Sequence, residues 1–167
     1  CLCDSPHLTA LRGLAVTGGG LAPDDRLGGD ASGAFAGASG LPALTDLDLR
    51  RNRIGGHDHG TRDLVFAPRA ARLRRLNLAD NAVTDFGVEA IRRRTEMRLT
   101  HLDVSHNRIT DRSAAALAAA EHLADLEELN LGGNRGIGDP GANALADSPH
   151  LGDLRRLDLT GTSVGPG

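Results

Sequence analysis

The sequence predicts an α/β solenoid in which parallel strands form a curved sheet on the concave face and helices cover the convex face. Three observations carry this prediction. A nine-residue pattern, L-x-x-L-x-L-x-x-N, recurs at nearly regular intervals, and a helix-start signal follows most of its copies. The segment DSPHLTALRGLAVTG (4–18) also returns as DSPHLGDLRRLDLTG (147–161), with ten of fifteen positions identical. Such self-similarity at a fixed period is the sequence signature of stacked repeats.

The pattern has four complete copies and two weaker ones. The complete copies are LTDLDLRRN (44–52), LRRLNLADN (73–81), LTHLDVSHN (99–107) and LEELNLGGN (126–134). LRGLAVTGG (11–19) and LRRLDLTGT (154–162) flank them, and the six starts are 33, 29, 26, 27 and 28 residues apart. The sequence therefore predicts about six repeats of ~28 residues. The duplicated end segments occupy the same place in repeats five units apart, which excludes a two-domain arrangement.

Each copy predicts a short strand followed by a tight turn. Leucines alternate within each copy, as expected for a strand with one buried face. We expect parallel strands near residues 14–16, 47–49, 76–78, 102–104, 129–131 and 157–159. Asparagine ends each complete copy at one register, as Asn52, Asn81, Asn107 and Asn134. Its amide can bond turn backbone that would otherwise be buried and unpaired, so we interpret these four residues as structural.

Helices are predicted after the turns. The clearest are 85–96 and 111–123, and each begins with an aspartate placed to cap the helix start. A third helix is expected over 139–148, where Pro140 suits the first turn. Pro68 should end the helix of the second repeat, because proline cannot continue a helical hydrogen-bond ladder. The segment 22–43 holds seven glycines and prolines, so we expect its helix to be short and frayed.

These motifs resemble the leucine-rich repeat proteins of the ribonuclease-inhibitor-like type, which have long repeats and full convex helices. The SPHL-x-x-L-x-x-L-x-L phrase is similar to repeats of bacterial leucine-rich repeat proteins from G+C-rich genomes. The resemblance covers nearly the whole chain, and it implies a binding protein whose concave face contacts its partner.

The composition indicates the source, the kind of partner and the cellular location of the protein. The net charge is −3, and all 19 basic residues besides histidine are arginine, which is typical of a G+C-rich bacterial gene. The near-neutral balance argues against nucleic acid as a partner, and no stretch reaches the ~20 apolar residues that a membrane helix needs. Cys1 and Cys3 are the only cysteines, which favours a reduced, cytoplasmic location. The alternative is a lipoprotein anchored at Cys1.

The ends of the chain lead to two further expectations. Neither end shows a capping unit with a polar outer face, although solenoids need one for solubility. We therefore expect residues 1–167 to form a single array that is a fragment of a longer chain. Uncapped ends also predict edge-to-edge self-association.

Catalytic and cofactor motifs are not found. The chain has neither a phosphate-binding G-x-x-x-x-G-K-[ST] loop nor a G-x-S-x-G nucleophile elbow. His57, Asp58 and His59 form one dense titratable cluster, but nothing nearby in sequence supplies a clear third metal ligand. A polar turn is the better interpretation of this cluster. We expect a protein that is not an enzyme and that binds no cofactor or metal.

The third, fifth and seventh positions of each copy should point outward from the concave sheet. The candidate partner-binding residues at these positions are Asp46, Asp48, Arg50, Arg75, Asn77, His101, Asp103, Ser105, Glu128, Asn130, Arg156 and Asp158. The third position varies most in chemistry, so we expect specificity there. The fifth is acid-leaning, and it is either a track for a basic peptide or a residue type that the repeat itself requires.

These residues predict a protein–protein interaction scaffold that binds a protein or peptide along the concave face. The alternative is a targeting module of a larger enzyme or effector whose active domain lies outside this segment. None of the three phenylalanines falls in the outward columns, and tryptophan and tyrosine are absent. Tight interfaces are enriched in such anchors, so we expect weak binding led by charge.

Overall fold

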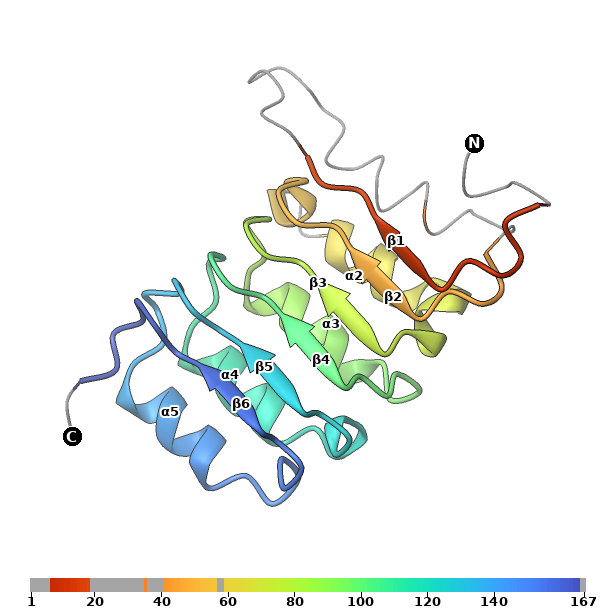
Figure 1. Ribbon diagram of the computed structural model, residues 1–167. Helices are drawn as coiled ribbons and strands as arrows, with labels where there is room; N and C mark the ends of the chain where they lie inside the picture. The colour runs from red at the N-terminus through yellow and green to blue at the C-terminus, as the bar shows by residue number, and fades with distance from the viewer. Residues whose placement is uncertain (1–6, 19–34, 36–40, 57–58, 166–167) are drawn as a thin grey trace.

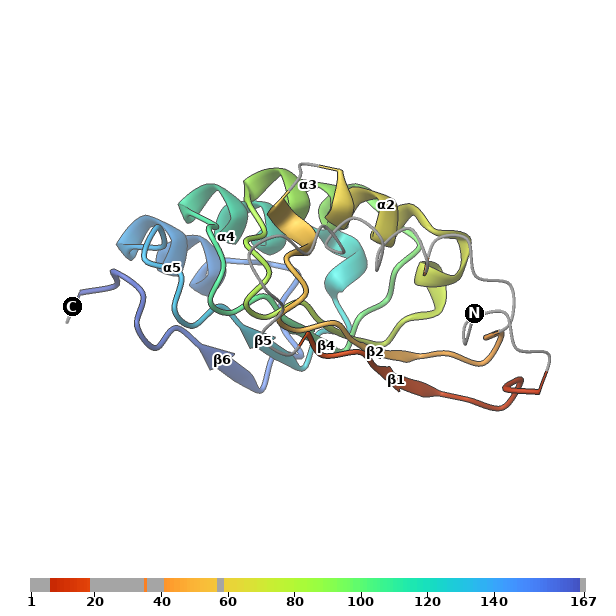
Figure 2. The same cartoon turned by 90° about the horizontal axis from the view of Figure 1, so that it is seen from above.

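A computed structural model describes residues 7–18, 35, 41–56 and 59–165. Six three-residue strands form one sheet in chain order, and every neighbouring pair is parallel (Figure 1). They are β1 (Gly13–Ala15), β2 (Asp46–Asp48), β3 (Arg75–Asn77), β4 (His101–Asp103), β5 (Glu128–Asn130) and β6 (Arg156–Asp158). The sheet forms one layer and the helices form the other (Figure 2). The predicted α/β solenoid is thus confirmed.

The strands lie one residue earlier than the sequence pattern predicts. The hydrogen-bond ladder nevertheless continues past them, since the Leu49 amide donates to the Asn77 carbonyl at 2.9 Å and the Arg51 amide to the Ala79 carbonyl at 3.0 Å. At Arg51 the backbone enters the left-handed region, with φ of 61°. The chain therefore turns away from the strand direction before the parallel hydrogen-bond ladder ends.

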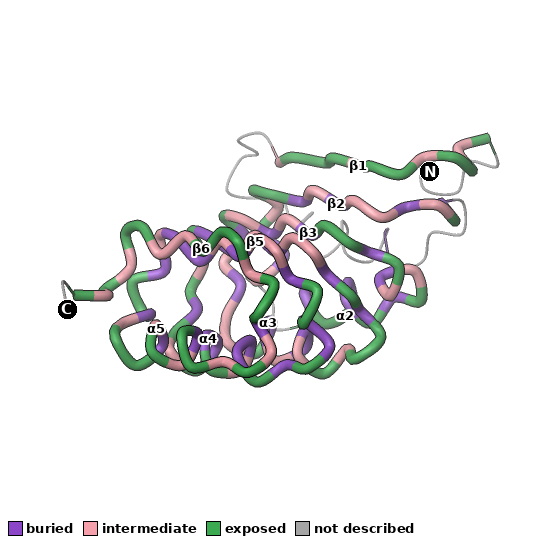
Figure 3. The backbone as a smooth tube through the Cα atoms, turned by 60° about the horizontal axis from the view of Figure 1, so that its bottom comes forward, coloured by how far each residue is buried: buried purple, intermediate pink, exposed green. Residues whose placement is uncertain are grey.

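Strand register stacks equivalent leucines from repeat to repeat. Leu47 pairs with Leu76, Leu76 with Leu102, and Leu102 with Leu129, and all four are buried. Each fully buried leucine contributes roughly 1.5–3 kcal/mol relative to an exposed one. Buried residues concentrate between the sheet and the helices, whereas the outer surfaces are exposed (Figure 3). Because the interior repeats bury their leucines against their neighbours, these strands are held at a fixed register.

The convex helices are α2 (Gly60–Phe66), α3 (Asp85–Arg93), α4 (Asp111–Ala118) and α5 (Asp139–Ala146), and short 3-10 helices cover Ile54–Gly56, Pro68–Arg72 and Glu121–Leu123. The helix of the second repeat ends before Pro68, as predicted. The other three end two to five residues earlier than predicted, at Arg93, Ala118 and Ala146. The chain uses those residues to return to the next strand, through the 3-10 helix Glu121–Leu123 in the fourth repeat.

The aspartates at the helix starts do not cap their own helices, contrary to the sequence prediction. The N-cap residues are Thr84, Thr110 and Gly138, each one position earlier. The expected irregular segment 22–43 lies outside the described residues except for Phe35 and residues 41–43. None of the helices in the described ranges is long and apolar enough to cross a membrane.

Candidate functional site

A shallow hollow of about 690 Å³ runs across the concave face and touches all six strands. Its polar lining comes from the third and fifth positions of the repeats, as the sequence pattern predicts for outward-facing residues. These lining residues are Asp46, Asp48, Arg75, Asn77, His101, Asp103, Glu128, Asn130, Arg156 and Asp158. The structure therefore brings together ten of the twelve predicted partner-binding residues on one surface.

Third-position side chains form ion pairs between neighbouring strands. Arg75 Nε lies 3.3 Å from Asp46 Oδ1, and Arg156 Nη1 lies 3.2 Å from Glu128 Oε1. His101 Nε2 lies 3.8 Å from Glu128 Oε1, where protonation of the imidazole would create a further ion pair. The arginine side chains remain 60% and 72% exposed, so these charges stay accessible to a partner.

Fifth-position side chains are bound to their own backbone instead. The side-chain oxygen of each accepts a hydrogen bond from the amide two residues later: Asp48 from Arg50 at 3.1 Å, Asn77 from Ala79 at 2.9 Å, Asp103 from Ser105 at 2.9 Å, Asn130 from Gly132 at 3.0 Å and Asp158 from Thr160 at 2.8 Å. Aspartate and asparagine commonly make this turn. Hydrogen bonds from the Thr160 side chain and amide also lower the pKa of Asp158. The acid-leaning column thus has a structural cause.

The seventh-position side chains do not line the concave hollow, although the sequence pattern predicts that they point outward from the concave sheet. With Asp80 and His106, Arg50 and Ser105 instead line a depression of about 360 Å³ beside the turns, which adjoins the concave hollow at Asn77 and Asp103. Ser105 is only 5% exposed, and Arg50 is paired with Asp48 at 2.7 Å. The reason is the left-handed turn at the following residue, which bends the chain away from the sheet. These two residues therefore lie beside the concave hollow rather than within it.

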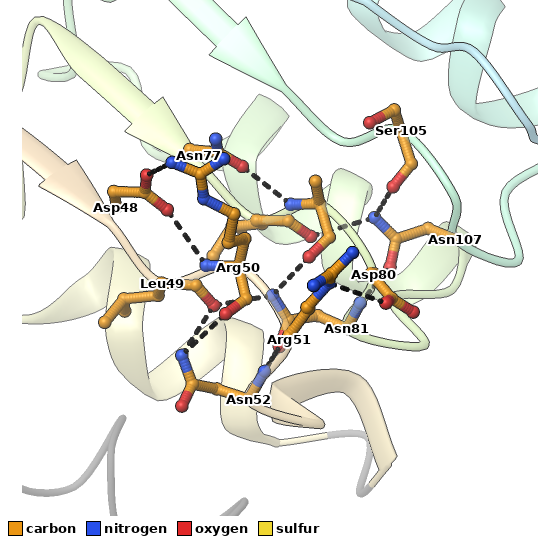
Figure 4. Close-up of polar contacts among 12 residues, drawn as sticks. Asp48, Leu49, Arg50, Arg51, Asn52, Asn77, Asp80, Asn81, Ser105 and Asn107 are labelled. Atoms are coloured by element: carbon orange, nitrogen blue, oxygen red, sulfur yellow. Dashed lines mark hydrogen bonds and ion pairs between the residues drawn. The ribbon is translucent and has the colours of Figure 1, made fainter. Parts of the chain in front are cut away.

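The four repeat asparagines form a continuous ladder along the turns, which we call the asparagine ladder. Asn81 Oδ1 accepts from the amides of Asn52 at 2.8 Å and Ile54 at 3.2 Å, and its Nδ2 donates to the Leu49 carbonyl at 2.8 Å. All three of these groups belong to the preceding repeat. Figure 4 shows Asn52, Asn81 and Asn107 following one another in this arrangement.

The later members of the ladder repeat the pattern. Asn107 Oδ1 accepts from the amides of Asn81 and Val83, and Asn134 Oδ1 accepts from those of Asn107 and Ile109. Asn81 and Asn134 are buried, whereas Asn52 and Asn107 are half-buried. At the sixth repeat, Thr162 replaces asparagine and its hydroxyl donates to the Leu159 carbonyl at 2.6 Å. Each asparagine therefore satisfies backbone groups of the repeat before it.

A second set of polar bonds points in the opposite direction along the chain. Asp85 accepts from the amide and hydroxyl of Thr110, at 2.9 and 2.8 Å, and from the Ser113 hydroxyl. Asp111 accepts from the amides of Gly138 and Gly141, at 2.7 and 3.0 Å. Burial alone would raise the pKa of Asp85, but the Ser113 and Thr110 hydrogen bonds outweigh it and lower the pKa. The first helical aspartate of one repeat thus bonds the residues that begin the helix of the next, and Asp111 caps α5 directly.

In the part of the chain that the structure describes, no three histidine, cysteine, aspartate or glutamate side chains are grouped so that they could hold a metal ion. His57 and Asp58 of the predicted polar turn lie outside the described residues, as do Cys1 and Cys3. His59 is described and exposed, just before α2.

Sequence reasoning missed a second hollow on the convex side, between α2 and α3. It has a volume of about 590 Å³, and Phe66 and Phe86 contribute to its lining. The available signal was the phenylalanine after the helix-start aspartate of the third repeat, where the later repeats carry Arg112 and Pro140. Only the packing of α2 against α3 brings Phe66 beside it.

The parallel inner strands, outer helices and asparagine ladder define a repeat solenoid built from strand–turn–helix units. A family model described as Leucine Rich repeat matches residues 41–56, 72–91, 98–118 and 122–146. The chain belongs to the leucine-rich repeat proteins. Such solenoids offer extended concave surfaces for binding, and this makes a protein–protein interaction module the general class of function.

One solved structure with a similar fold is an internalin (InlF) from Listeria monocytogenes. The likeness has a TM-score of 0.46 and 20% sequence identity, and it covers 74% of this chain. The chain spans 29% of the length of that internalin chain. Comparison with curated proteins finds no match.

Proposed function

We propose that the chain binds an extended protein or peptide segment along the concave face, and that the third position of the repeats provides specificity. The observation that carries this proposal is the contrast between the two outward columns. Fifth-position side chains are held by the backbone in every described repeat from the second to the sixth. Third-position side chains bond only other side chains: they pair with one another, and Asp46 and His101 also contact the hydroxyls of Thr45 and Thr100. The charges of Arg75 and Arg156 stay accessible.

The partner should carry charges that complement an alternating pattern. Along the sheet the third position presents Asp46, Arg75, His101, Glu128 and Arg156 in order. Neighbouring strands are ~4.8 Å apart, so opposite charges lie at about that spacing between Asp46 and Arg75 and between Glu128 and Arg156, with His101 between the two pairs. A segment lying across the strands could exchange the lateral ion pairs for its own. Since these pairs are exposed, each is worth only about 0–1 kcal/mol, and a partner can displace them at low cost.

Salt dependence tests this proposal. A dodecapeptide selected on the immobilised chain should bind weakly and with fast exchange, and its affinity should fall as salt is raised, because the screening length shortens from ~8 Å at physiological ionic strength to ~3 Å at 1 M. The combined Arg75→Ala and Glu128→Ala variant, which removes two third-position charges of opposite sign, should bind more weakly still. Affinity that is equal at both salt concentrations and survives the double substitution would place the interaction surface elsewhere.

A further inference from the structure

The convex hollow between α2 and α3 holds the described aromatic residues that are open to solvent. The side chain of Phe86 is 66% exposed and that of Phe66 is 43% exposed, whereas Phe35 is buried at 3%. The chain has three phenylalanines and no tryptophan or tyrosine, so two of its three aromatic side chains meet at this one place. Burying large aromatic surface is favourable, and its exposure here calls for an explanation.

The repeat architecture does not require phenylalanine at these positions. Phe86 is the second residue of α3, and the second residues of α4 and α5 are Arg112 and Pro140. Phe66 is the last residue of α2, and the last residues of α4 and α5 are Ala118 and Ala146. The fold therefore tolerates small or polar residues where the convex hollow has aromatic ones.

Charges around the convex hollow sum to a positive rim. Arg92 binds the Glu89 carboxylate through two bonds of 2.7 Å, and Arg93 binds it through a third of 2.7 Å. Two arginines thus share one carboxylate, which leaves one positive charge in excess. Arg62 is exposed and has no ion pair within the described part of the chain. Arg94 stacks over Phe66 with its guanidinium 5.7 Å from the ring centre, and it pairs with Glu96.

We propose that the convex hollow docks a protein segment in which a bulky apolar side chain is flanked by carboxylates. The apolar side chain fits between Phe66 and Phe86, and the carboxylates pair with Arg62 and Arg93. Phenylalanine is enriched in protein interfaces and arginine in their hot spots, and this pair of helices brings both together. The convex hollow lies on the face opposite the concave sheet, so it is a second docking surface that does not depend on the first.

Peptide selection tests the proposal although the natural partner is unidentified. A random dodecapeptide library is selected on the chain carrying Arg75→Ala and Glu128→Ala, which weakens concave binding. Selected peptides should combine a large apolar residue with aspartate or glutamate. Their affinity should fall by about tenfold or more when Phe86→Ala and Arg62→Glu are introduced together, as expected for an interface hot spot.

Two further variants locate the binding. Arg112→Ala alters the matched position of the next helix and should leave affinity unchanged. Phe86→Trp introduces a single tryptophan into a chain that has none, so its emission should shift to shorter wavelength as a selected peptide is added. Because both positions are exposed, unfolding temperatures should stay near that of the parent.

Three outcomes would overturn the proposal: a library that yields no enriched peptide, peptides that bind the Phe86→Ala and Arg62→Glu variant equally well, or peptides that are basic. Failure here would leave the concave proposal intact, because that proposal is measured with different residues.

Discussion

Asn81 shows how one side chain can serve two repeats. It is 1% exposed and bonds the backbone of Asn52, Ile54 and Leu49 in the preceding repeat, and the Ala79 carbonyl in its own. Water has little access to these groups, so each depends on the asparagine for a partner. An unpaired buried backbone group destabilises the fold by much more than a typical hydrogen bond stabilises it.

Replacing Asn81 with alanine should therefore destabilise the chain by about 1–3 kcal/mol. Urea unfolding followed by circular dichroism measures the change. Asn143→Ala is the matched control, because Asn143 is exposed on α5 and has no side-chain hydrogen bond among the described residues. If both variants unfold at the same urea concentration, the asparagine ladder does not stabilise the fold.

At the residue scale, the sequence predicted the register of the asparagines but not the role of every acid. Periodicity identifies which side chains face outward, because it follows from strand geometry. It does not reveal that the carboxylates of Asp48, Asp103 and Asp158 accept bonds from the backbone two residues on. Whether such a carboxylate bonds the backbone depends on the local turn. An aspartate that faces solvent without this bond has the same place in the sequence pattern.

Helices of neighbouring repeats are connected through their first turns. Asp111 lies in α4, yet its carboxylate accepts two amides at the start of α5. Asp139 makes the corresponding bond to the Gly165 amide at 2.8 Å. The asparagine ladder reaches back along the chain and these aspartates reach forward, so neighbouring repeats are joined by polar bonds at the turns and at the helix starts.

We expect Asp111→Ala to destabilise the chain by about 1 kcal/mol, the usual cost of losing a helix cap. The effect should be local: amide hydrogen exchange should quicken in the first turn of α5 and stay unchanged in α4. Asp153→Ala, at an exposed position without a hydrogen bond among the described residues, should change neither. Faster exchange in α4 instead would mean that Asp111 caps its own helix.

The helices also show where sequence reasoning stops. Aspartate before an apolar periodic stretch marks a helix start correctly, but it does not say whose amides the carboxylate will meet. The helix ends were predicted two to five residues too late, because alanine-rich segments such as 119–123 favour helix by propensity. In the structure the return to the strand overrides that preference: Leu123 and Leu126 must both be buried beneath the sheet.

At the scale of the whole molecule, the two faces are polar in different ways. The concave face alternates charges in a nearly balanced column, and the convex hollow combines aromatic rings with an excess of arginine. The end strand β6 is less covered than the interior strands, and its Leu157 is 40% exposed. Edge-to-edge self-association through such strands stays a prediction.

One buried histidine should make the stability of the fold depend on pH. His122 is 6% exposed, and its Nε2 has no hydrogen-bond partner among the described residues. Burial lowers its pKa below the ordinary value of 6.5, and the nearby charges of Arg98 and Arg92 lower it further. The unfolded chain therefore takes up a proton more readily than the folded chain, so stability falls as pH drops below about 6.5.

The free energy of unfolding should decline between about pH 7.5 and pH 5.5, and this decline should be weaker in His122→Leu. Urea unfolding across the pH series measures both slopes. Glu89 does not interfere, because its bonds with Arg92 and Arg93 lower its pKa from 4.5 to about 2, and its contribution is lost only below pH 4.5. Parallel pH profiles for the two proteins would show that His122 is not the group responsible.

Binding of a partner through the third-position charges is the central claim, and a charge exchange tests it most directly. Glu128→Arg combined with Arg156→Glu keeps an ion pair between β5 and β6 but reverses the pattern that a partner meets. The test peptide is selected on the chain carrying Phe86→Ala and Arg62→Glu, so that the convex hollow does not contribute. We predict an unchanged unfolding temperature and a loss of affinity of about tenfold or more. Unchanged affinity in the exchanged variant would contradict the claim.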